Sequence, residues 1–219
     1  MSILNGFELR LADAEDMDTI FKIRYKAFLL AGLIGPSPTR QFSDLYDASG
    51  KATTLVLSHR QKLIGTARFV ADSQIGLPMD DEGFGPCLAT LRQAGRRFVE
   101  AGRLAMLPEY QSRSRELSLH LCLYTISCAL LTGYDDMVIM VANHHVKFYE
   151  KVLMFETIAS DHVTRYCQNS YSLRLNLKKL MQRYEGSRTA RKFGLPNYLK
   201  GYQAMQLREQ PNGSKSAFN

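Results

Sequence analysis

The sequence contains no apolar run long enough to span a membrane. A spanning helix needs roughly 20 consecutive apolar residues, and no stretch of the 219 residues approaches that length. The first residues, Met1 to Leu11, also lack the basic and then apolar layout of a signal peptide. We therefore expect a soluble, cytoplasmic protein.

Cysteines are few and are not arranged as metal ligands. The four are Cys87, Cys122, Cys128 and Cys167, and they form no CxxC pair and have no companion histidine spacing. This pattern argues against a zinc site and against a disulfide framework. We expect reduced, mostly buried thiols, no metal and no permanently bound cofactor.

The chain also lacks an internal repeat, and its length predicts one domain. At 219 residues and 45% hydrophobic composition it can bury one sizeable core. We place this domain at residues 1–185. Residues 186–219 form a basic C-terminal tail that we expect to pack loosely, because it is rich in polar and turn residues.

The net charge of +7 is confined to the C-terminal segment. Residues 1–177 hold equal numbers of basic and acidic residues, whereas residues 178–219 hold nine basic and two acidic ones. Such a segment can attract nucleic acid, a membrane surface or an acidic protein, or can simply maintain solubility. No recognition-helix, zinc-finger or stacking-aromatic pattern supports nucleic acid. We expect no nucleic acid partner, and peripheral membrane contact through the tail stays open.

Hydrophobic periodicity predicts an α/β domain with a mixed central sheet flanked by helices. The expected elements, in order, are strand Phe7–Leu11, a helix with its apolar stripe from Met17 to Phe28, an irregular stretch over 33–49, hairpin strands Thr53–Leu57 and Leu63–Val70, strand Phe98–Leu107, helix Ser114–Leu131, strand Met137–Val141, helix His145–Leu153, and closing strands Phe155–Ile158 and Tyr171–Leu177.

Glu100 and Arg103 lie on the predicted middle strand, on either side of Gly102. In a regular strand their side chains would leave opposite faces. A glycine inside a strand often marks a bulge, which would bring both to one face and free a backbone group for a ligand. Burial would raise the pKa of Glu100 towards the range of a general base. The alternative is a buried Glu–Arg pair that only holds the strand.

Two further arginines, Arg24 and Arg68, fall among apolar positions and therefore require anions. Asp44 and Asp47, in the irregular stretch, could supply them. So could the carboxylate of an amino-acid-like substrate, held by the planar guanidinium fork. The two aspartates could instead be turn formers, which is the commoner role of aspartate next to tyrosine and glycine.

The start of the long helix gathers Arg113, Ser114 and Arg115 beside free backbone N–H groups. Cations and N–H groups at the positive end of a helix suit a phosphate, although a helix capped by Ser114 explains the same residues. Further along, Tyr149 lies one turn after His145. A phenol there could protonate a departing thiolate.

The second half of the chain resembles the donor-binding half of GNAT acetyltransferases. A strand, a Gln/Arg-rich turn, a long helix and a short apolar strand precede Asn143, Tyr149 and Phe155 at the spacing of that family. The resemblance implies a GNAT-like acyl-CoA N-acyltransferase fold. Met154 replaces the glycine usual before the phenylalanine, and the turn lacks glycine. Such a turn suits the single phosphate of the phosphopantetheine on an acyl carrier protein.

A second resemblance is more specific. In order and spacing, these residues resemble the signature of acyl-homoserine-lactone (autoinducer) synthases: Arg24, Phe28, Asp44, Asp47, Arg68, Phe84, Glu100 and Arg103. Ile34 replaces an aromatic residue usual there. Residues 143–149 instead resemble the long-chain N-acyl amino acid synthases (FeeM-like), which share the fold and the E-x-x-R strand. We prefer this family, which transfers acyl chains from acyl carrier protein to the α-amine of an amino acid.

The resemblance implies a role for each matching residue. Glu100, Arg68 and Tyr149 would be catalytic, with the free backbone beside Gly102 holding the thioester oxygen. The acceptor would be bound by Arg24, Phe28, Asp44, Asp47, Phe84 and Arg103. The donor, acyl-phosphopantetheine or acyl-CoA, would be bound by Leu104, Met106, Arg113, Ser114, Arg115, Asn143 and His145. Arg92, Arg96 and Arg97, together with the basic turn, would receive the acidic carrier protein.

Three rival functions remain at this stage. An acyl-homoserine-lactone synthase would differ in its acceptor, S-adenosylmethionine. A coenzyme A-dependent acetyltransferase is disfavoured by the glycine-free turn. A non-catalytic acyl or carrier-protein binding module would bind the donor and be indifferent to the substitution Glu100→Gln.

Overall fold

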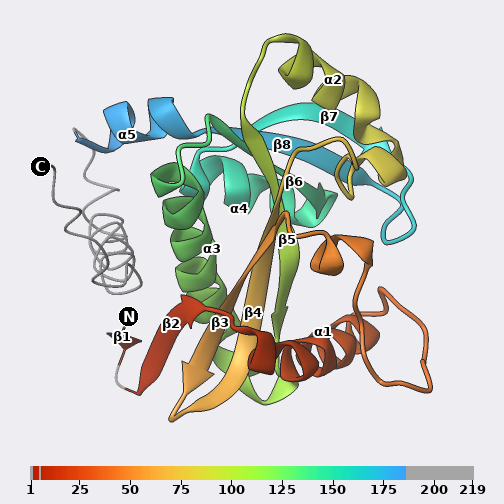
Figure 1. Cartoon of the computed structure of the whole chain (residues 1–219), viewed down its shortest axis with the longest axis vertical. Coiled ribbons are helices and arrows are strands. Elements are labelled where there is room, and N and C mark those ends of the chain that lie inside the picture. Colours follow the sequence, from red (N-terminus) through yellow and green to blue (C-terminus); the bar gives the residue numbers. More distant parts are fainter. Residues whose placement is uncertain (1, 5, 186–219) are drawn as a thin grey trace, which may run out of the picture.

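The computed structural model describes residues 2–4 and 6–185, which form one eight-stranded mixed sheet with helices on both faces (Figure 1). The strand order is β1-β2-β3-β4-β5-β6-β8-β7. The strands are β1 Ser2–Leu4, β2 Phe7–Leu11, β3 Ala52–His59, β4 Lys62–Ala71, β5 Phe98–Met106, β6 Asp136–Ala142, β7 Glu156–His162 and β8 Ser170–Asn176. The helices are α1 Met17–Leu30, α2 Gly85–Gln93, α3 Ser114–Leu131, α4 Asn143–Leu153 and α5 Leu177–Glu185. The predicted mixed sheet flanked by helices is confirmed.

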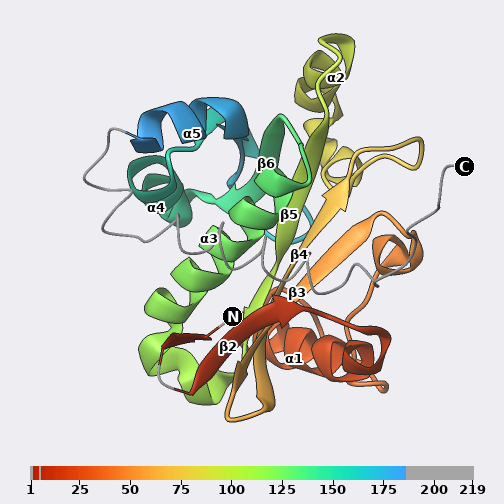
Figure 2. The same cartoon turned by 60° about the vertical axis from the view of Figure 1, so that its left-hand side comes forward.

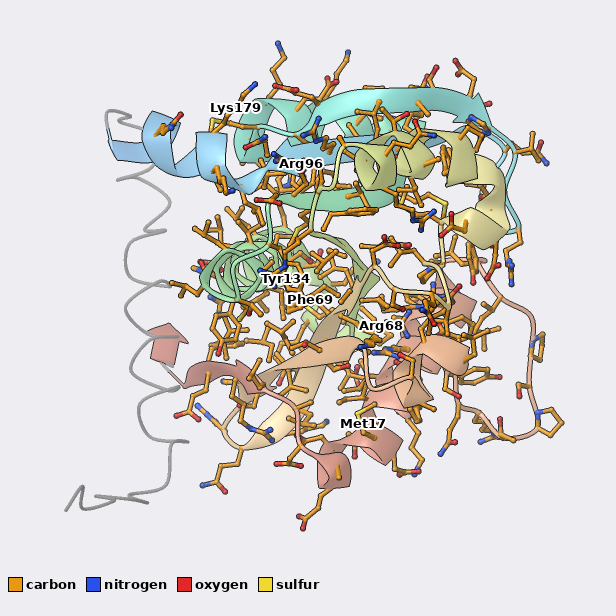
Figure 3. The ribbon with its side chains drawn as sticks, turned by 45° about the horizontal axis from the view of Figure 1, so that its top comes forward. Met17, Arg68, Phe69, Arg96, Tyr134 and Lys179 are labelled. Carbon is orange, nitrogen blue, oxygen red and sulfur yellow. The ribbon has the colours of Figure 1, made fainter. Side chains whose placement is uncertain are left out.

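Helix α1 covers one face of the sheet, and α3 covers the other (Figure 2). Strand alternation explains how β4 serves both layers, because successive side chains point to opposite faces. Phe69 joins the main core with α3, whereas its neighbour Arg68 points towards the segment that follows α1 (Figure 3). One strand therefore supplies both a packed core and a polar site.

All neighbouring strands pair antiparallel except β5 and β6, which are parallel and joined by the α3 crossover. Their pairing runs from Phe98 opposite Asp136 to Ala101 opposite Ile139 and then stops. Both strands continue for several residues beyond this point. Their carboxyl ends therefore diverge, and backbone groups of the two strands face an opening in the sheet.

The predicted bulge is present, one residue beyond the glycine. Thr66 of β4 lies opposite Ala105, and Arg68 lies opposite Gly102, so Arg103 and Leu104 together face a single residue of β4. Arg103 has φ 53°, in the left-handed region, which costs a residue with a side chain about 1 kcal/mol. Gly102 has room beside it, because an added Cβ would meet no atom within 4 Å.

The sequence predicted α1 and its start correctly and missed the segment before β5. Asp13 and Asp16 form a capping box on the 3-10 turn Ala14–Asp16, which leads directly into α1. The segment Asp80–Phe84 is a π-helical turn with Gly83 at φ 87°, and it leads into α2. Gly83, Gly85 and Pro86 break the periodicity there, so no helix was predicted.

The described residues contain no helix long and apolar enough to cross a membrane. The predicted tail, residues 186–219, lies outside the described residues. The domain boundary at residue 185 stays a prediction.

Packing of α3 into the main core predicts the stability cost of removing one of its buried side chains. Leu121 of α3 is fully buried among the side chains of this core, so Leu121→Ala should lower the free energy of unfolding by about 3 kcal/mol. Leu30, 61% exposed at the end of α1, is the matched control, and Leu30→Ala should cost less than about 0.5 kcal/mol. Urea titration followed by circular dichroism measures both. Equal costs would show that α3 does not pack as described.

Candidate active site

Two buried carboxylates hold three arginines together at the centre of the candidate site. Asp47 accepts from Arg24 at 2.8 Å and lies 2.7 Å from a nitrogen of Arg68, both at the same oxygen Oδ1. The side chains of Arg24 and Asp47 are 0% and 4% exposed. Attraction between such charges is strong because little water screens it. Asp47 thereby links α1 to β4.

Asp44 completes this buried charge cluster, which we define as Arg24, Asp44, Asp47, Arg68 and Arg103. Arg68 donates to both oxygens of Asp44 at 2.6 and 3.0 Å, and Arg103 donates through Nε and Nη2 at 3.0 and 2.6 Å. Burial alone would raise the pKa of Asp44, but the hydrogen bonds and charges of Arg68 and Arg103 outweigh it and hold this pKa well below its usual range.

The aspartates act as turn formers at the same time. Asp44 caps the 3-10 turn Leu45–Ala48 by accepting from the backbone of Tyr46 at 3.0 Å, and Asp47 accepts from the backbone of Asp44 at 3.0 Å. Asp44 and Asp47 are therefore both counter-charges for the arginines and turn formers. The turn fixes the carboxylates, and the carboxylates then fix the arginines.

The cluster carries one positive charge in excess, because three arginines face two aspartates. Nε and Nη2 of the buried Arg24 have no hydrogen-bond partner. Burial lowers the pKa of Arg24 despite the attraction of Asp47. A site of this kind favours a further negative charge nearby.

Glu100 lies on the same face of the sheet as Arg68. Val70 pairs with Glu100 and Arg68 pairs with Gly102, so these four residues share one face. Glu100 is 7% exposed, and its Oε2 accepts from the backbone N–H of Met79 at 2.8 Å. Burial raises its pKa to about 8, against the lowering effects of that hydrogen bond and of Arg103 and Arg68. This carboxylate titrates where a general base operates.

A cavity of about 1380 Å³ opens where β5 and β6 diverge. Its walls come from the bulge on β5 and the adjoining part of β4, the ends of α1 and β6, the start and middle of α3, the length of α4, and the β7–β8 loop. Deep in the cavity the lining is apolar and belongs to the main core, including Ile126, Met137, Ile139 and Leu153. An apolar cavity of this size can hold a long hydrocarbon chain.

The structure divides the residues predicted for the site into two groups. The cavity is lined by Phe28, Arg68, Arg103, Leu104, Arg113, Ser114, Arg115, His145 and Tyr149. Behind it lie Arg24, Asp44, Asp47 and Glu100 in the polar layer, with Phe84 in the smaller core beside them. Arg68 and Arg103 are members of the charge cluster and also line the cavity, so they connect the buried group of residues to the cavity.

Two predicted donor residues do not line the cavity. Met106 packs against the main core near Gly65, and Asn143 begins α4 with its backbone N–H bonded to Asn169. A role for either in donor binding is not supported by this geometry.

Tyr149 lies inside the cavity wall, where its hydroxyl forms a hydrogen bond with the thiol of Cys122. Burial raises the pKa of Tyr149 well above its ordinary value, and Cys122 adds to this effect. Burial likewise raises the pKa of Cys122 to about 12. Both groups are therefore protonated, so Tyr149 has a proton to give.

The start of α3 differs from the prediction. Ser114 does not cap the helix, because the 3-10 turn Pro108–Arg113 runs directly into α3 and no side chain caps its first N–H groups. Ser114 and Arg115 still line the cavity mouth, while Arg113 donates to Glu116 at 2.8 Å. His144 and His145 face this region from the start of α4.

The additional arginines predicted to bind the carrier protein, Arg92, Arg96 and Arg97, contact other residues of this chain. Arg92 bonds Asp72 and Asp80, and Arg96 bonds the buried Asp136. Arg97 lies over the ring of Tyr134. Arg92 and Arg96 therefore have structural partners within the chain, and their contact with a carrier protein stays a prediction.

Sequence reasoning missed four residues of the site. Met79 orients Glu100, Cys122 meets Tyr149, and Phe42 and Tyr166 contact Arg103. Phe42 and Tyr166 lie in loops without periodicity, and Met79 acts through its backbone. Only the position of Cys122 on an apolar helix gave a signal.

The charge cluster makes the second prediction. Asp47→Asn should lower the free energy of unfolding by about 3 kcal/mol or more, because it leaves Arg24 and Arg68 without a buried counter-charge. Asp18→Asn is the matched control. Asp18 pairs with Lys22 on the exposed surface of α1, where such pairs contribute about 0.5 kcal/mol. Guanidinium titration measures both, and a cost for Asp47→Asn as small as that of the control would contradict the role of the cluster.

Solved structures of similar fold include an N-acyl amino acid synthase, an acyl-homoserine lactone synthase and a putative acetyltransferase. FeeM, an N-acyl amino acid synthase from uncultured soil microbes, has a TM-score of 0.70 and 22% identity, over 84% of this chain and 97% of that chain. BjaI, a CoA-dependent acyl-homoserine lactone synthase solved with SAM and isopentyl-CoA, has a TM-score of 0.63 and 15% identity, over 87% and 91%. YncA, a putative acetyltransferase from Salmonella typhimurium with acetyl-CoA, has a TM-score of 0.54 and 22% identity, over 79% and 95%.

These likenesses establish the GNAT-like fold. The search of curated protein sequences found no significant match. The family model described as N-acyl amino acid synthase FeeM matches residues 19–176, a span that contains the charge cluster, Glu100 and the diverging strands. The chain therefore belongs to the FeeM N-acyl amino acid synthase family and is an N-acyltransferase.

Proposed function

We propose that this enzyme transfers a long acyl chain from a thioester donor to the α-amine of an amino acid. The observation that carries the proposal is the position of Glu100. A buried carboxylate with a pKa of about 8 lies on the strand whose bulge opens into a large apolar cavity. Strand β5 thus carries the base, behind the cavity wall, and the backbone donors that border the acyl-chain volume.

The acceptor enters beside the charge cluster. Arg68 and Arg103 reach the cavity, and the cluster has one uncompensated positive charge. An α-carboxylate brought by an amino acid balances this charge, with its α-amine directed towards Glu100. Arg24, Asp44 and Asp47 order these arginines from behind, and Phe28 closes the wall at the end of α1.

Glu100 removes a proton from the ammonium group, directly or through one water molecule. The neutral amine attacks the thioester carbonyl carbon and forms the tetrahedral intermediate. Its oxygen gains negative charge, which backbone N–H groups can stabilise. The bulge at Arg103 and Leu104 supplies such groups, because β5 has lost its pairing with β6 there.

Collapse of the intermediate breaks the carbon–sulfur bond and releases the thiolate. The nitrogen loses its second proton, which reaches the thiolate through Tyr149, so that the products are an amide and a thiol. Tyr149 is the proton donor to the thiolate, since its phenol is neutral and lines the cavity. Its present partner, the thiol of Cys122, is a weak acceptor. Exchanging that partner for the departing sulfur therefore costs little.

The donor is an acyl-phosphopantetheine on acyl carrier protein, with acyl-CoA as the alternative. Ser114, Arg115 and His145 surround the cavity mouth at the starts of α3 and α4. No side chain caps the start of α3, and the positive end of a helix suits a phosphate. The exposed Arg115 is placed to meet an acidic carrier surface. This reaction would take place in the cytoplasm.

An acyl-homoserine-lactone synthase is the second candidate, favoured by the likeness to BjaI. Its acceptor, S-adenosylmethionine, brings a sulfonium charge in addition to its amine and carboxylate. Analysis of the acylated product separates the two.

Glu100 makes the third prediction. Glu100→Gln should lower kcat by about 100-fold or more, because an amide cannot accept the proton. In the native enzyme the unprotonated, active form of Glu100 accumulates as pH rises through about 8, so kcat/KM should increase with pH across that range and then level off. Mass spectrometry of the N-acyl amino acid formed at each pH measures both effects.

Glu156→Gln is the control for this experiment, because Glu156 is an exposed carboxylate on the edge strand β7. It should leave the rate and the pH profile unchanged. Full activity of Glu100→Gln, with the native pH profile, would show that Glu100 is not the base.

A further inference from the structure

Two aromatic rings lie against the guanidinium of Arg103 at the acceptor side of the cavity, and a third ring packs against one of them. The guanidinium carbon lies 5.1 Å from the centre of the Phe42 ring and 5.5 Å from that of Tyr166. Phe42 in turn meets Phe28 edge-on, with ring centres 5.2 Å apart. These rings come from α1, from the segment after it and from the β7–β8 loop. Segments far apart in the sequence therefore meet at one cation.

Tyr166 differs from the other two rings because its loop is held by contacts with the π-helical turn Asp80–Phe84. Glu82, 8% exposed, accepts from the backbone N–H of Arg165 at 3.0 Å and also pairs with the Arg165 guanidinium. The ring of His162 packs against Phe84, with centres 4.5 Å apart. The π-helical turn Asp80–Phe84 thus anchors the loop on both sides of Thr164.

The loop is also braced internally. Thr164 and Cys167 exchange backbone and side-chain hydrogen bonds at 2.9, 3.1 and 3.2 Å. Tyr166 is held between them, half-buried, with its ring against the cavity and its hydroxyl 3.5 Å from Nη2 of Arg103. An aromatic side chain kept partly exposed by a braced loop is available for contact with a ligand.

We propose that Tyr166 forms the acceptor-side wall of the cavity and determines which amine is accepted. The inference rests on the proposed function, whose acceptor enters beside Arg68 and Arg103. The ring holds the Arg103 guanidinium by cation–π contact and presents its remaining surface to the acceptor side chain. Tyr166 therefore influences acceptor binding and leaves the thioester end of the cavity untouched.

Steady-state kinetics provide the first test. Tyr166→Ala should raise KM for the amino acid about 5- to 20-fold, consistent with the loss of a cation–π contact and a stacking surface. The value of kcat and KM for the acyl donor should stay within about 2-fold. Tyr166→Phe, which keeps the ring, should restore most of the acceptor affinity. Tyr171→Ala is the matched control, because Tyr171 lies on β8 and bonds the exposed Asp161.

An equal rise in both KM values, or an unchanged acceptor KM, would overturn the inference. So would a Tyr166→Phe variant as impaired as Tyr166→Ala. Each of these outcomes is compatible with an active enzyme, so none of them bears on the proposed function.

A binding measurement tests the inference without relying on turnover. The chain contains no tryptophan, so Tyr166→Trp introduces a single tryptophan at the proposed wall, which can be excited selectively over the tyrosines. Titration with each of the standard L-amino acids should give a saturable change in emission for the accepted ones and none in a Tyr171→Trp control. No response to any amino acid would overturn the inference. Failure of the native enzyme to form an N-acyl amino acid would instead overturn the proposed function.

Discussion

The buried pairing of Asp47 with Arg24 and Arg68 is the interaction on which the site depends. A single carboxylate oxygen accepts from one arginine on α1 and lies against another on β4. Removing such charges from water is costly unless each has a partner. The irregular segment that carries Asp44 and Asp47 is therefore held to the sheet, and Asp44 extends the same network to the bulge on β5.

This constraint explains how a strained backbone persists at the reacting centre. Arg103 adopts a left-handed conformation, and its side chain is bound by Asp44 and stacked between Phe42 and Tyr166. The bulge ends the regular ladder of β5, and the strand then leaves β6. Fold and proposed chemistry are coupled, since Arg103, which we propose to order the acceptor site, also lies at the bulge where β5 leaves the regular ladder.

Periodicity in the sequence was enough to predict the mixed sheet, α1, α3 and the hairpin of β3 and β4, because their apolar patterns are strong. A charged residue at an apolar position similarly singled out Arg24, Arg68 and Glu100. The α2 segment was missed where Gly83 and Pro86 interrupt the pattern, and Ser114 was wrongly predicted as a cap because a 3-10 turn continues into α3. Tyr166 could not be predicted, since its place depends on the contact between Glu82 and Arg165.

The most direct test of the account is reconstitution with purified protein. A long-chain acyl donor, supplied on acyl carrier protein or on coenzyme A, is mixed with the standard L-amino acids, and products are identified by mass spectrometry. The account predicts an N-acyl amino acid whose formation requires the native enzyme. Formation of an acyl-homoserine lactone from S-adenosylmethionine, with no acylated amino acid, would contradict it.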